Sequence, residues 1–515
     1  MSRETEGKFE VFRHSRVTKA RALRLHLPLH LKELPLHPKQ ASYTEDRIDY
    51  WEDYAKSESG FGILRRGYRD RLQEFYQFLI PPGMRVLELG SGEGDLLAAV
   101  QPSVGVGVDF CPAMIHRAHA KYPKLRFVEA DAHFVDLNDE TFDFVIVSDL
   151  VNDLWNVQQV FSNALRYAHP ETRIILNSYS RLWEGPRRIA EWTGFAKKQR
   201  LQNWLTREDL ENLLYLADFE VIRASQEVLL PLNVPLLGAL ANKFAVKLWP
   251  VRHLGLTNFV IARPMPHAQQ IPEPIVSVIV AARNEAGNVA NIFDRVPQMG
   301  GGTELIFVEG GSKDDTYAII ELEIAARGSL GLAGPARLYR QTGKGKGDAV
   351  RLGFAKATGD VLMILDADLT VPPEDLPHFY NAWRSGRGEF VNGVRLVYPM
   401  EGGAMRFFNF LGNKFFSMAF SWLLGQSIKD TLCGTKVLSK GHYKMIADNR
   451  AYFGDFDPFG DFDLIFGAAH FNMKIVDLPV RYGERVYGDT NIQRWSHGWL
   501  LLKMVVYAMG RLKFV

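Results

Sequence analysis

The chain alternates short apolar runs with amphipathic helical stretches, and this alternation occurs twice. In the first half, apolar runs of strand length bounded by turn residues lie at 84–88, 104–109, 125–129, 142–148 and 173–177. After residue 274 the alternation begins again, with strands expected at 276–281, 304–308 and 361–365. Strands separated by helical segments form βαβ units and a mostly parallel sheet. The pattern therefore predicts an α/β fold with two tandem, doubly wound domains.

Changes in composition predict the domain boundaries. Residues 1–40 are basic and dotted with His, Leu and Pro, which favours a poorly ordered extension or a strap over a neighbouring domain. Residues 264–274 hold four prolines, a composition typical of a semi-rigid linker. We therefore expect domains at 41–263 and 275–515, and each is long enough for a core of its own.

Composition and charge exclude several classes of protein. With 47% hydrophobic and 23% charged residues in 515, the chain is neither disordered nor fibrous. A net charge of +2 gives no argument for a nucleic-acid partner. Two cysteines, Cys111 and Cys433, supply neither a disulfide framework nor a zinc site, so a reducing cytoplasm is expected.

Hydropathy along the chain indicates whether a segment could be a secretory signal or could span a membrane. The charged start does not predict a secretory signal, and no apolar run reaches the roughly 18 to 20 residues that span a bilayer. We expect a cytoplasmic protein, or one that is peripheral on the inner face of the membrane. The oligomeric state stays open.

The sharpest feature of the first domain is a glycine-rich turn after an apolar strand. The run Val86-Leu-Glu-Leu-Gly-Ser-Gly-Glu-Gly94 places Glu88 before three alternating glycines, Gly90, Gly92 and Gly94. A strand, a tight glycine turn and a helix N-terminus form a binding edge. Asp109 closes the next expected strand, where a carboxylate accepts ribose hydroxyls, and Asp131 follows the third.

These residues resemble the class I S-adenosylmethionine-dependent methyltransferases over residues 41–263. The resemblance implies S-adenosylmethionine as cofactor, with Glu88 and the glycines on its methionine and ribose side, Asp109 at the ribose and Asp131 at the adenine. The methyl acceptor stays open. Asp149 or Asp153 could act as a base, and the segments 183–188 and 229–240 favour a cover over a substrate.

In the second domain, one expected strand is followed by two carboxylates that are separated by one residue, Asp366 and Asp368. Such oxygen ligands suit Mg²⁺ or Mn²⁺, which in turn holds a diphosphate and makes a nucleoside diphosphate a better leaving group. Because such a pair is also common by chance, by itself it makes Asp366 and Asp368 only candidates for a metal site.

With its neighbours the motif resembles the inverting family 2 glycosyltransferases of GT-A fold, over about residues 275–500. The resemblance is strongest to polyprenyl-phosphate sugar synthases of the dolichyl-phosphate mannose synthase type. It implies a nucleotide pocket at Asn284, Glu285, Glu309 and Asp314. Ala281, Gly310 and Thr370 depart from that family's usual residues, which leaves the nucleotide identity open.

The same resemblance implies a donor such as GDP-mannose or UDP-glucose, a polyprenyl phosphate acceptor and a membrane surface as partners. Arg395 and Arg406 would grip phosphates, and Arg485 would help to close the site. A phosphate acceptor needs no general base, whereas a sugar hydroxyl does, and Asp461 or Asp463 could be that base. The aromatic-rich run 405–424 and the end segment 499–509 suit either a headgroup boundary or a buried helix pair.

The sequence therefore predicts a bifunctional transferase, with Asp366, Asp368, Arg395, Asp461 and Arg485 as catalytic candidates. Two alternatives stay open. The second domain could extend a glycan at a hydroxyl, or the first domain could be a binding module without catalysis.

Overall fold

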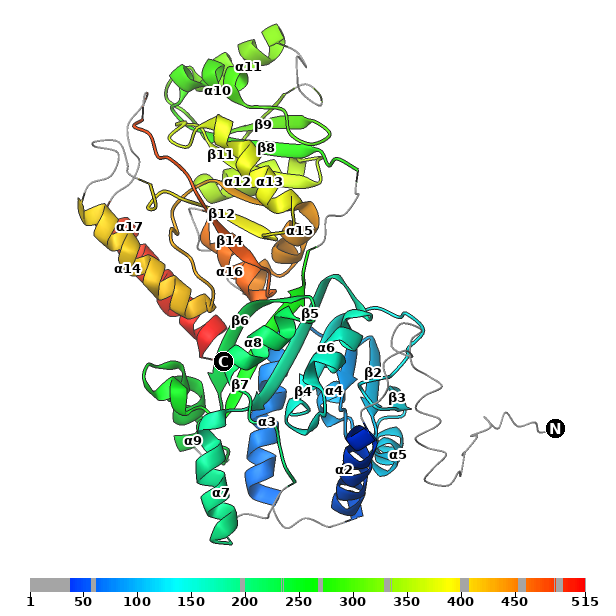
Figure 1. Cartoon of the computed structure of the whole chain (residues 1–515). Helices are drawn as coiled ribbons and strands as arrows, with labels where there is room; N and C mark the ends of the chain where they lie inside the picture. Colours follow the sequence, from blue (N-terminus) through cyan, green and yellow to red (C-terminus); the bar gives the residue numbers. More distant parts are fainter. Residues whose placement is uncertain are drawn as a thin grey trace, which may run out of the picture. The chain divides into compact units, whose positions relative to one another are not determined.

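The computed structural model describes two compact units, Met1–Met265 and Pro266–Val515 (Figure 1). The described residues are 38–56, 62–194, 200–232, 234, 236–266, 272–327, 334, 336–398, 407–452, 460–485, 487 and 494–514. Most of the predicted N-terminal extension and residues 267–271 of the predicted linker lie outside them.

The first unit is built on a seven-stranded sheet of order β3-β2-β1-β4-β5-β7-β6. Strands β1 to β5 are parallel, and β7 is antiparallel to both β5 and β6. The strands are β1 Arg85–Leu89, β2 Val104–Asp109, β3 Arg126–Glu129, β4 Phe142–Ser148, β5 Ala168–Tyr179, β6 Phe219–Glu227 and β7 Thr257–Pro264.

Helices connect and cover these strands. They are α2 Pro38–Lys56, α3 Gly62–Leu79, α4 Asp95–Ala99, α5 Pro112–Lys121, α6 Val157–Leu165, α7 Glu184–Trp192, α8 Arg207–Tyr215 and α9 Leu237–Ala239, with short helices η1 Val151–Asp153, η2 Arg181–Trp183, η3 Leu240–Phe244, η4 Ala245–Lys247 and η5 Val251–Leu254.

Apolar side chains fill both faces of this sheet. Leu87 and Leu89 of β1 belong to one buried cluster, and Val86, which directly precedes Leu87, belongs to another. Side chains alternate between the faces of a strand, so a strand that is apolar at consecutive positions must be covered on both sides. This arrangement confirms the predicted doubly wound α/β fold.

The second unit has its own seven-stranded sheet, of order β10-β9-β8-β11-β13-β12-β14. Strands β8 to β11 are parallel, whereas β13 runs antiparallel between β11 and β12. The strands are β8 Val276–Ala282, β9 Thr303–Glu309, β10 Arg337–Arg340, β11 Val361–Asp366, β12 Phe390–Val394, β13 Lys436–Ser439 and β14 Ile475–Pro479.

The helices of this unit are α10 Val289–Arg295, α11 Thr316–Arg327, α12 Lys346–Lys356, α13 Leu376–Arg384, α14 Phe407–Leu424, α15 Lys440–Asp448, α16 Phe462–His470 and α17 Arg494–Ala508, with short helices η6 Ala286–Asn288, η7 Pro373–Asp375, η8 Arg450–Tyr452 and η9 Met509–Lys513. Within the described part of the chain, no helix is both long and apolar enough to cross a bilayer.

Candidate functional sites

The glycine-rich turn of the first unit adopts a backbone that other residues rarely allow. Gly90, Gly92 and Gly94 have φ angles of 76°, 52° and 79°. A Cβ on Gly90 would strike the Leu150 side chain, and one on Gly94 would strike Phe127. The turn therefore requires glycine for conformation and for close approach.

Glu88 lies beneath this turn. Its side chain is buried, and Oε2 accepts a 3.1 Å hydrogen bond from the Leu97 amide of α4. Burial raises the pKa of Glu88 well above its ordinary value, and the Leu97 amide opposes that rise. Gly90, Asp109 and Asp131 line the adjoining cavity, whereas Glu88, Gly92 and Gly94 are not among its lining residues. Glu88 thus holds the turn and α4 together.

Asp109 stands at the end of β2 with both carboxylate oxygens directed at backbone amides. Oδ2 accepts from Gly92 at 2.9 Å, and Oδ1 accepts from Cys111 at 2.9 Å. Burial raises the pKa of Asp109, and the two amides oppose that rise. A carboxylate oxygen has a second lone pair, so each can still accept from a ligand hydroxyl.

Asp131 follows β3 and is paired with His133. Its Oδ1 accepts from the His133 amide at 2.9 Å and lies 2.5 Å from Nδ1 of the same residue. Burial opposes ionisation, but the pairing with His133 outweighs it, and the pKa of Asp131 is lowered. Because the Asn156 amide donates to Nε2 at 3.2 Å, the proton of a neutral His133 ring lies on Nδ1, toward Asp131.

Helix α2 contributes residues to the same cavity, which has an empty volume of about 390 Å³ and is partly open to solvent. Tyr43 and Arg47 of α2 line it beside Asp153 and Trp155. The Arg47 guanidinium lies 3.5 Å from Asp153 Oδ1 and donates to the Tyr43 hydroxyl at 2.9 Å. Sequence reasoning missed Tyr43 and Arg47, because they lie on α2, ahead of the first predicted strand, where no motif marks them.

The two candidate bases for methyl transfer have different surroundings. Asp153 is ion-paired with Arg47 in the cavity wall. Asp149, at φ 53°, accepts at Oδ1 from Tyr68 at 2.9 Å and from Asn177 at 2.6 Å. The Asp149 carboxylate is thus held against α3 and β5, while its neighbour Leu150 lines the cavity.

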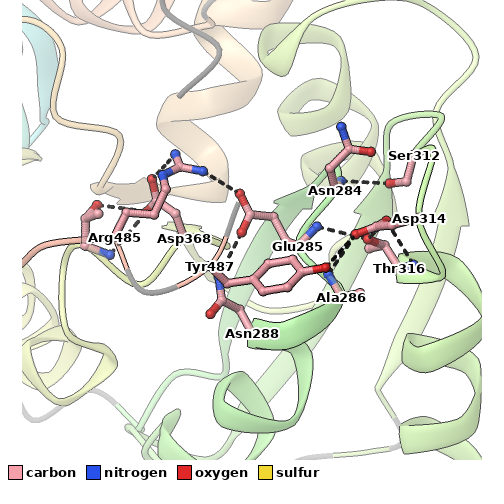
Figure 2. A network of polar contacts seen from close by, with 11 residues as sticks. Asn284, Glu285, Ala286, Asn288, Ser312, Asp314, Thr316, Asp368, Arg485 and Tyr487 are labelled. Atoms are coloured by element: carbon pink, nitrogen blue, oxygen red, sulfur yellow. Dashed lines mark hydrogen bonds and ion pairs between the residues drawn. The ribbon is translucent and has the colours of Figure 1, made fainter. Parts of the chain in front are cut away.

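In the second unit, two turns at the ends of β8 and β9 are bonded to each other (Figure 2). The Asn284 amide donates to Ser312 Oγ at 3.0 Å, and Asn284 Oδ1 accepts from the Lys313 amide at 2.7 Å. The Ala286 amide donates to Asp314 Oδ2 at 3.3 Å. The contacts to Asp314, chiefly from Thr316, outweigh its desolvation and lower its pKa.

The other predicted pocket residue of this edge, Glu309, ends β9. It is buried, and its carboxylate accepts from the Ser312 amide. Asn284, Glu285, Glu309 and Asp314 are therefore linked through one pair of turns, which follow neighbouring parallel strands of the sheet.

Arg485 joins this edge to the acidic motif of β11 (Figure 2). Its Nη1 donates to Glu285 Oε1 at 2.9 Å, and its Nη2 donates to Asp368 Oδ2 at 2.7 Å. Asp368 Oδ1 accepts from Thr370 Oγ1 at 2.8 Å. The structure thus brings together three residues that are far apart in sequence.

Asp366 ends β11 next to a lysine that sequence reasoning did not single out. The Lys346 ammonium is ion-paired with Asp366 Oδ1. Burial opposes the ionisation of Asp366, but Lys346, Lys436 and Arg395 outweigh it and lower its pKa. A Cβ on Gly434 would strike both Asp366 and Lys346, so this close approach depends on glycine.

Arg395, predicted to grip phosphate, is buried against Asp430. Nε and Nη2 donate to the two Asp430 oxygens at 2.7 and 2.9 Å, and the guanidinium lies 5.0 Å from the ring centroid of Tyr482. The pair opposes the effect of burial, lowering the pKa of Asp430 to about 2 and raising that of Arg395. The positive charge of Arg395 therefore helps to lower the pKa of Asp366, while two of its N–H groups are hydrogen-bonded to Asp430. The other predicted arginine, Arg406, lies outside the described residues.

Asp461 and Asp463 separate into different surroundings. Asp461 Oδ1 lies 3.2 Å from the ammonium of Lys436, a fully buried lysine, and Asp461 also helps to raise the pKa of Lys346 against its desolvation. Asp463 instead faces Arg351 at 3.7 Å and Arg450 at 3.3 Å. Of the two, Asp461 belongs to the charge cluster around Asp366.

The donor chemistry of Asp366 and Asp368 fits a divalent cation. Both offer carboxylate oxygens, and both already face cationic groups, Lys346 and Arg485. No group of three or more ligating side chains occurs among the described residues. Mg²⁺ is commonly held by one or two carboxylates together with substrate phosphates, so two acids suffice for such a site.

The raised pKa of Glu285 predicts that the stability of the protein depends on pH. Burial raises the pKa of this residue from 4.5 to about 7, with Arg485 opposing that rise. The folded state therefore retains a proton that the unfolded state has lost, and the free energy of unfolding falls as pH rises from about 4.5 to about 7. Glu285→Gln removes this slope. The stability of Glu285→Gln relative to wild type should increase by roughly 1 to 2 kcal/mol from pH 5 to pH 8, because solvent screening reduces the full effect of the pKa difference.

Thermal unfolding across this pH range measures the effect. Glu321→Gln on the exposed side of α11 is the control and should show no such trend. A constant difference between Glu285→Gln and wild type would contradict the prediction.

Two family models match the chain, one in each unit. The model described as "Methyltransferase domain" matches residues 62–224, and the one described as "Glycosyl transferase family 2" matches residues 277–442. The dolichol-phosphate mannosyltransferase of Pyrococcus furiosus is 29% identical over 42% of this chain and 59% of its own length. An undecaprenyl-phosphate 4-deoxy-4-formamido-L-arabinose transferase of Sodalis glossinidius is 24% identical over 42% and 62%. The chain thus spans about three fifths of the length of these relatives.

Among solved structures, the chain resembles the magnesium protoporphyrin IX methyltransferase of Synechocystis, with 14% identity and a TM-score of 0.30 over 44% of this chain and 97% of that one. A SAM-dependent methyltransferase of Aquifex aeolicus gives 16% identity and a TM-score of 0.29 over 43% and 98%.

Proposed function

We propose that this transferase, which joins a methyltransferase domain to a family 2 glycosyl transferase domain, catalyses two separate group transfers. The second domain transfers a hexose from a nucleotide diphosphate sugar to a polyprenyl phosphate, with inversion at the sugar. The first transfers a methyl group from S-adenosylmethionine. The observation that carries the sugar transfer is the convergence of Glu285, Asp368 and Arg485 at one edge of the β8–β11 sheet.

The nucleotide sugar would lie at this edge. The turns 284–286 and 312–316 supply the base and ribose pocket, and Asp366 and Asp368 would hold Mg²⁺ or Mn²⁺ against the diphosphate. The bound metal would absorb negative charge on the departing nucleoside diphosphate. Lys346 and Arg485 already contact the same acids, and their cationic donors are suited to the same phosphate oxygens.

The names of the relatives and the chemistry of the nucleophile support a polyprenyl phosphate as acceptor. The names of two relatives contain dolichol phosphate and undecaprenyl phosphate, which are both polyprenyl phosphates. A phosphate monoester is already an anionic nucleophile near neutral pH and requires no base. Lys436 and Arg395 are each paired with an acid, but their positive charge still acts on Asp366, and this supports an anionic acceptor.

Asp461 supports the alternative, a sugar hydroxyl as acceptor, because its carboxylate belongs to the same charge cluster. Asp461→Asn distinguishes the two. With a phosphate acceptor we expect the turnover number to fall less than about tenfold, whereas loss of a general base costs about 10²- to 10⁴-fold.

Initial rates at saturating donor measure this difference. Asp463→Asn, whose carboxylate faces Arg351 and Arg450, is the matched control. A loss of 10²-fold or more in Asp461→Asn alone would reject the phosphate acceptor.

For the first domain, we propose that Asp109 binds the ribose hydroxyls of S-adenosylmethionine and that Asp131 lies at its adenine. The acids at the ends of β2 and β3 line one cavity with Gly90, as such a cofactor requires. Asp149 and Asp153 are the candidate bases, and the methyl acceptor stays open.

We also propose that the glycosyltransferase domain works at the cytoplasmic membrane surface. Leu411, Phe415 and Met418 form an exposed stripe on α14, and Trp499 and Val506 are exposed on α17. An apolar helix face with aromatic residues is suited to the headgroup boundary, where a lipid-linked acceptor lies.

Incubation of the purified chain with Mn²⁺, a panel of nucleotide sugars and a short polyprenyl phosphate tests the proposal. We expect a lipid product heavier by one hexose, as measured by mass spectrometry. The absence of such a product with GDP- and UDP-sugars, in a protein that binds S-adenosylmethionine, would reject it.

A further inference from the structure

The connection between β6 and β7 is unusually long. These strands are antiparallel neighbours, with Glu227 paired to Thr257, and such hairpins usually close in about two to five residues. Here residues 228–256, which we call the hairpin platform, contain α9 and the short helices η3, η4 and η5.

Buried polar contacts fix the platform to β6 and hold it together internally. Lys247 is ion-paired with Glu227, and both side chains are buried. Asn242 accepts from the Leu229 and Leu230 amides at 2.8 Å each, and its Nδ2 donates to the Leu230 carbonyl at 2.7 Å. A segment held in this way presents its outer side chains in fixed positions.

The outer side chains of the platform are apolar and large. Leu237, Leu240 and Trp249 are 61%, 60% and 75% exposed, and Phe244, Leu248 and Leu254 are also exposed. Single exposed apolar residues are common, but a group of them on one segment indicates an interaction surface.

Helix α7 extends this surface. The Trp183 indole donates to the Leu254 carbonyl at 3.0 Å, which joins the start of α7 to the platform. On α7, Ile189 and Trp192 are 63% and 87% exposed. Two exposed tryptophans, Trp192 and Trp249, therefore belong to connected segments.

The charge of the platform indicates which kind of partner binds its apolar surface. Residues 228–256 contain no Asp or Glu, and they include exposed Arg252 and His253 as well as half-buried Lys243. The cavity between the platform and α3 is lined by Asp70 and Glu74 of α3 beside Arg71 and Lys243, so these acids have basic neighbours. Two platforms facing each other would place cations against cations, which disfavours a second copy.

We infer that the hairpin platform docks the methyltransferase unit on an anionic lipid bilayer. Tryptophan and leucine enter the headgroup boundary, while lysine and arginine meet anionic headgroups. This surface belongs to the first unit, whereas α14 and α17 belong to the second, and the inference does not depend on the sugar chemistry. It implies that the methyl acceptor is reached at a membrane surface.

A local probe tests this inference in the full chain. Leu240→Cys is labelled with an environment-sensitive dye, and the buried Cys111 and Cys433 leave the new thiol as the reactive one. With vesicles of phosphatidylcholine and phosphatidylglycerol at 3:1, we expect a blue shift and at least twofold quenching by brominated lipid. The same dye at the exposed position of Lys124→Cys should respond to neither.

A charge variant provides the second measurement. The double variant Leu240→Asp, Trp249→Asp should reduce partitioning onto these vesicles at least tenfold while S-adenosylmethionine binding is retained. Tyr215→Asp, at a residue 65% exposed on α8, should leave partitioning unchanged.

Three results would overturn the inference. The first is an unshifted dye at position 240 when the protein sediments with the vesicles, and the second is no binding to anionic vesicles at all. The third is a dye shift without lipid that follows self-association in analytical ultracentrifugation, since this would identify a second copy as the occupant.

Discussion

Asp368→Asn should lower sugar transfer by about 10²- to 10³-fold, which is the range seen when one preorganised electrostatic contact to a transition state is lost. The change keeps the shape of the side chain but removes the charge that faces Arg485 at 2.7 Å. It therefore weakens both the proposed metal site and the hold on Arg485. Steady-state rates at varied Mn²⁺ measure the effect, and we expect S-adenosylmethionine affinity to stay the same.

The matched control for this variant is Glu374→Gln. Glu374 forms an exposed two-bond pair with Arg295 at 2.8 and 2.9 Å and lies outside the charge cluster. Its loss should leave sugar transfer within about twofold, because surface ion pairs contribute little to stability. Equal rates for Asp368→Asn and wild type would remove the basis for a metal site at β11.

The second large effect is expected at Asp109→Asn. We expect S-adenosylmethionine affinity to fall about 10- to 100-fold, since hydrogen bonds to a charged acceptor are worth about 1.5–3 kcal/mol. An amide keeps one oxygen but cannot accept at both positions. Isothermal titration calorimetry with S-adenosylmethionine measures the change, and sugar transfer in the same preparation reports that the other domain is intact.

Glu129→Gln is the control for that variant. Glu129 is paired in register with Asp109 at the end of the adjacent strand β3, but its side chain is exposed and is not among the cavity-lining residues. Unchanged affinity in Asp109→Asn would show that the ribose lies elsewhere. No heat even with wild type would favour the reading of this domain as a module without catalysis.

Much of the sheet framework could be predicted from sequence, because buried parallel strands are apolar throughout and end in turn residues. The strands Val104–Asp109 and Phe142–Ser148 were predicted at their observed bounds. Residues at the ends of such strands meet at one sheet edge, which explains why Asp109 and Asp131 line one cavity and why Asn284 and Asp314 are linked through their turns.

The partners of the acids could not be predicted in this way. Lys436 begins β13, which enters the sheet antiparallel to β11, and no local pattern says beside which strand it will lie. Lys346 meets Asp366 only because Gly434 leaves room for both. These contacts depend on tertiary approach, which is not encoded in the periodicity of any single segment.

The bridge made by Arg485 has a consequence for assembly during protein synthesis. Glu285 and Asp368 leave the ribosome long before Arg485, so the nascent chain first carries the two acids without the guanidinium that links them. The methyltransferase unit is complete by Met265. A stop codon shortly before codon 485 would therefore leave a chain that retains the cavity lined by Asp109 and Asp131 in the first unit but lacks the Arg485 link between Glu285 and Asp368 in the second.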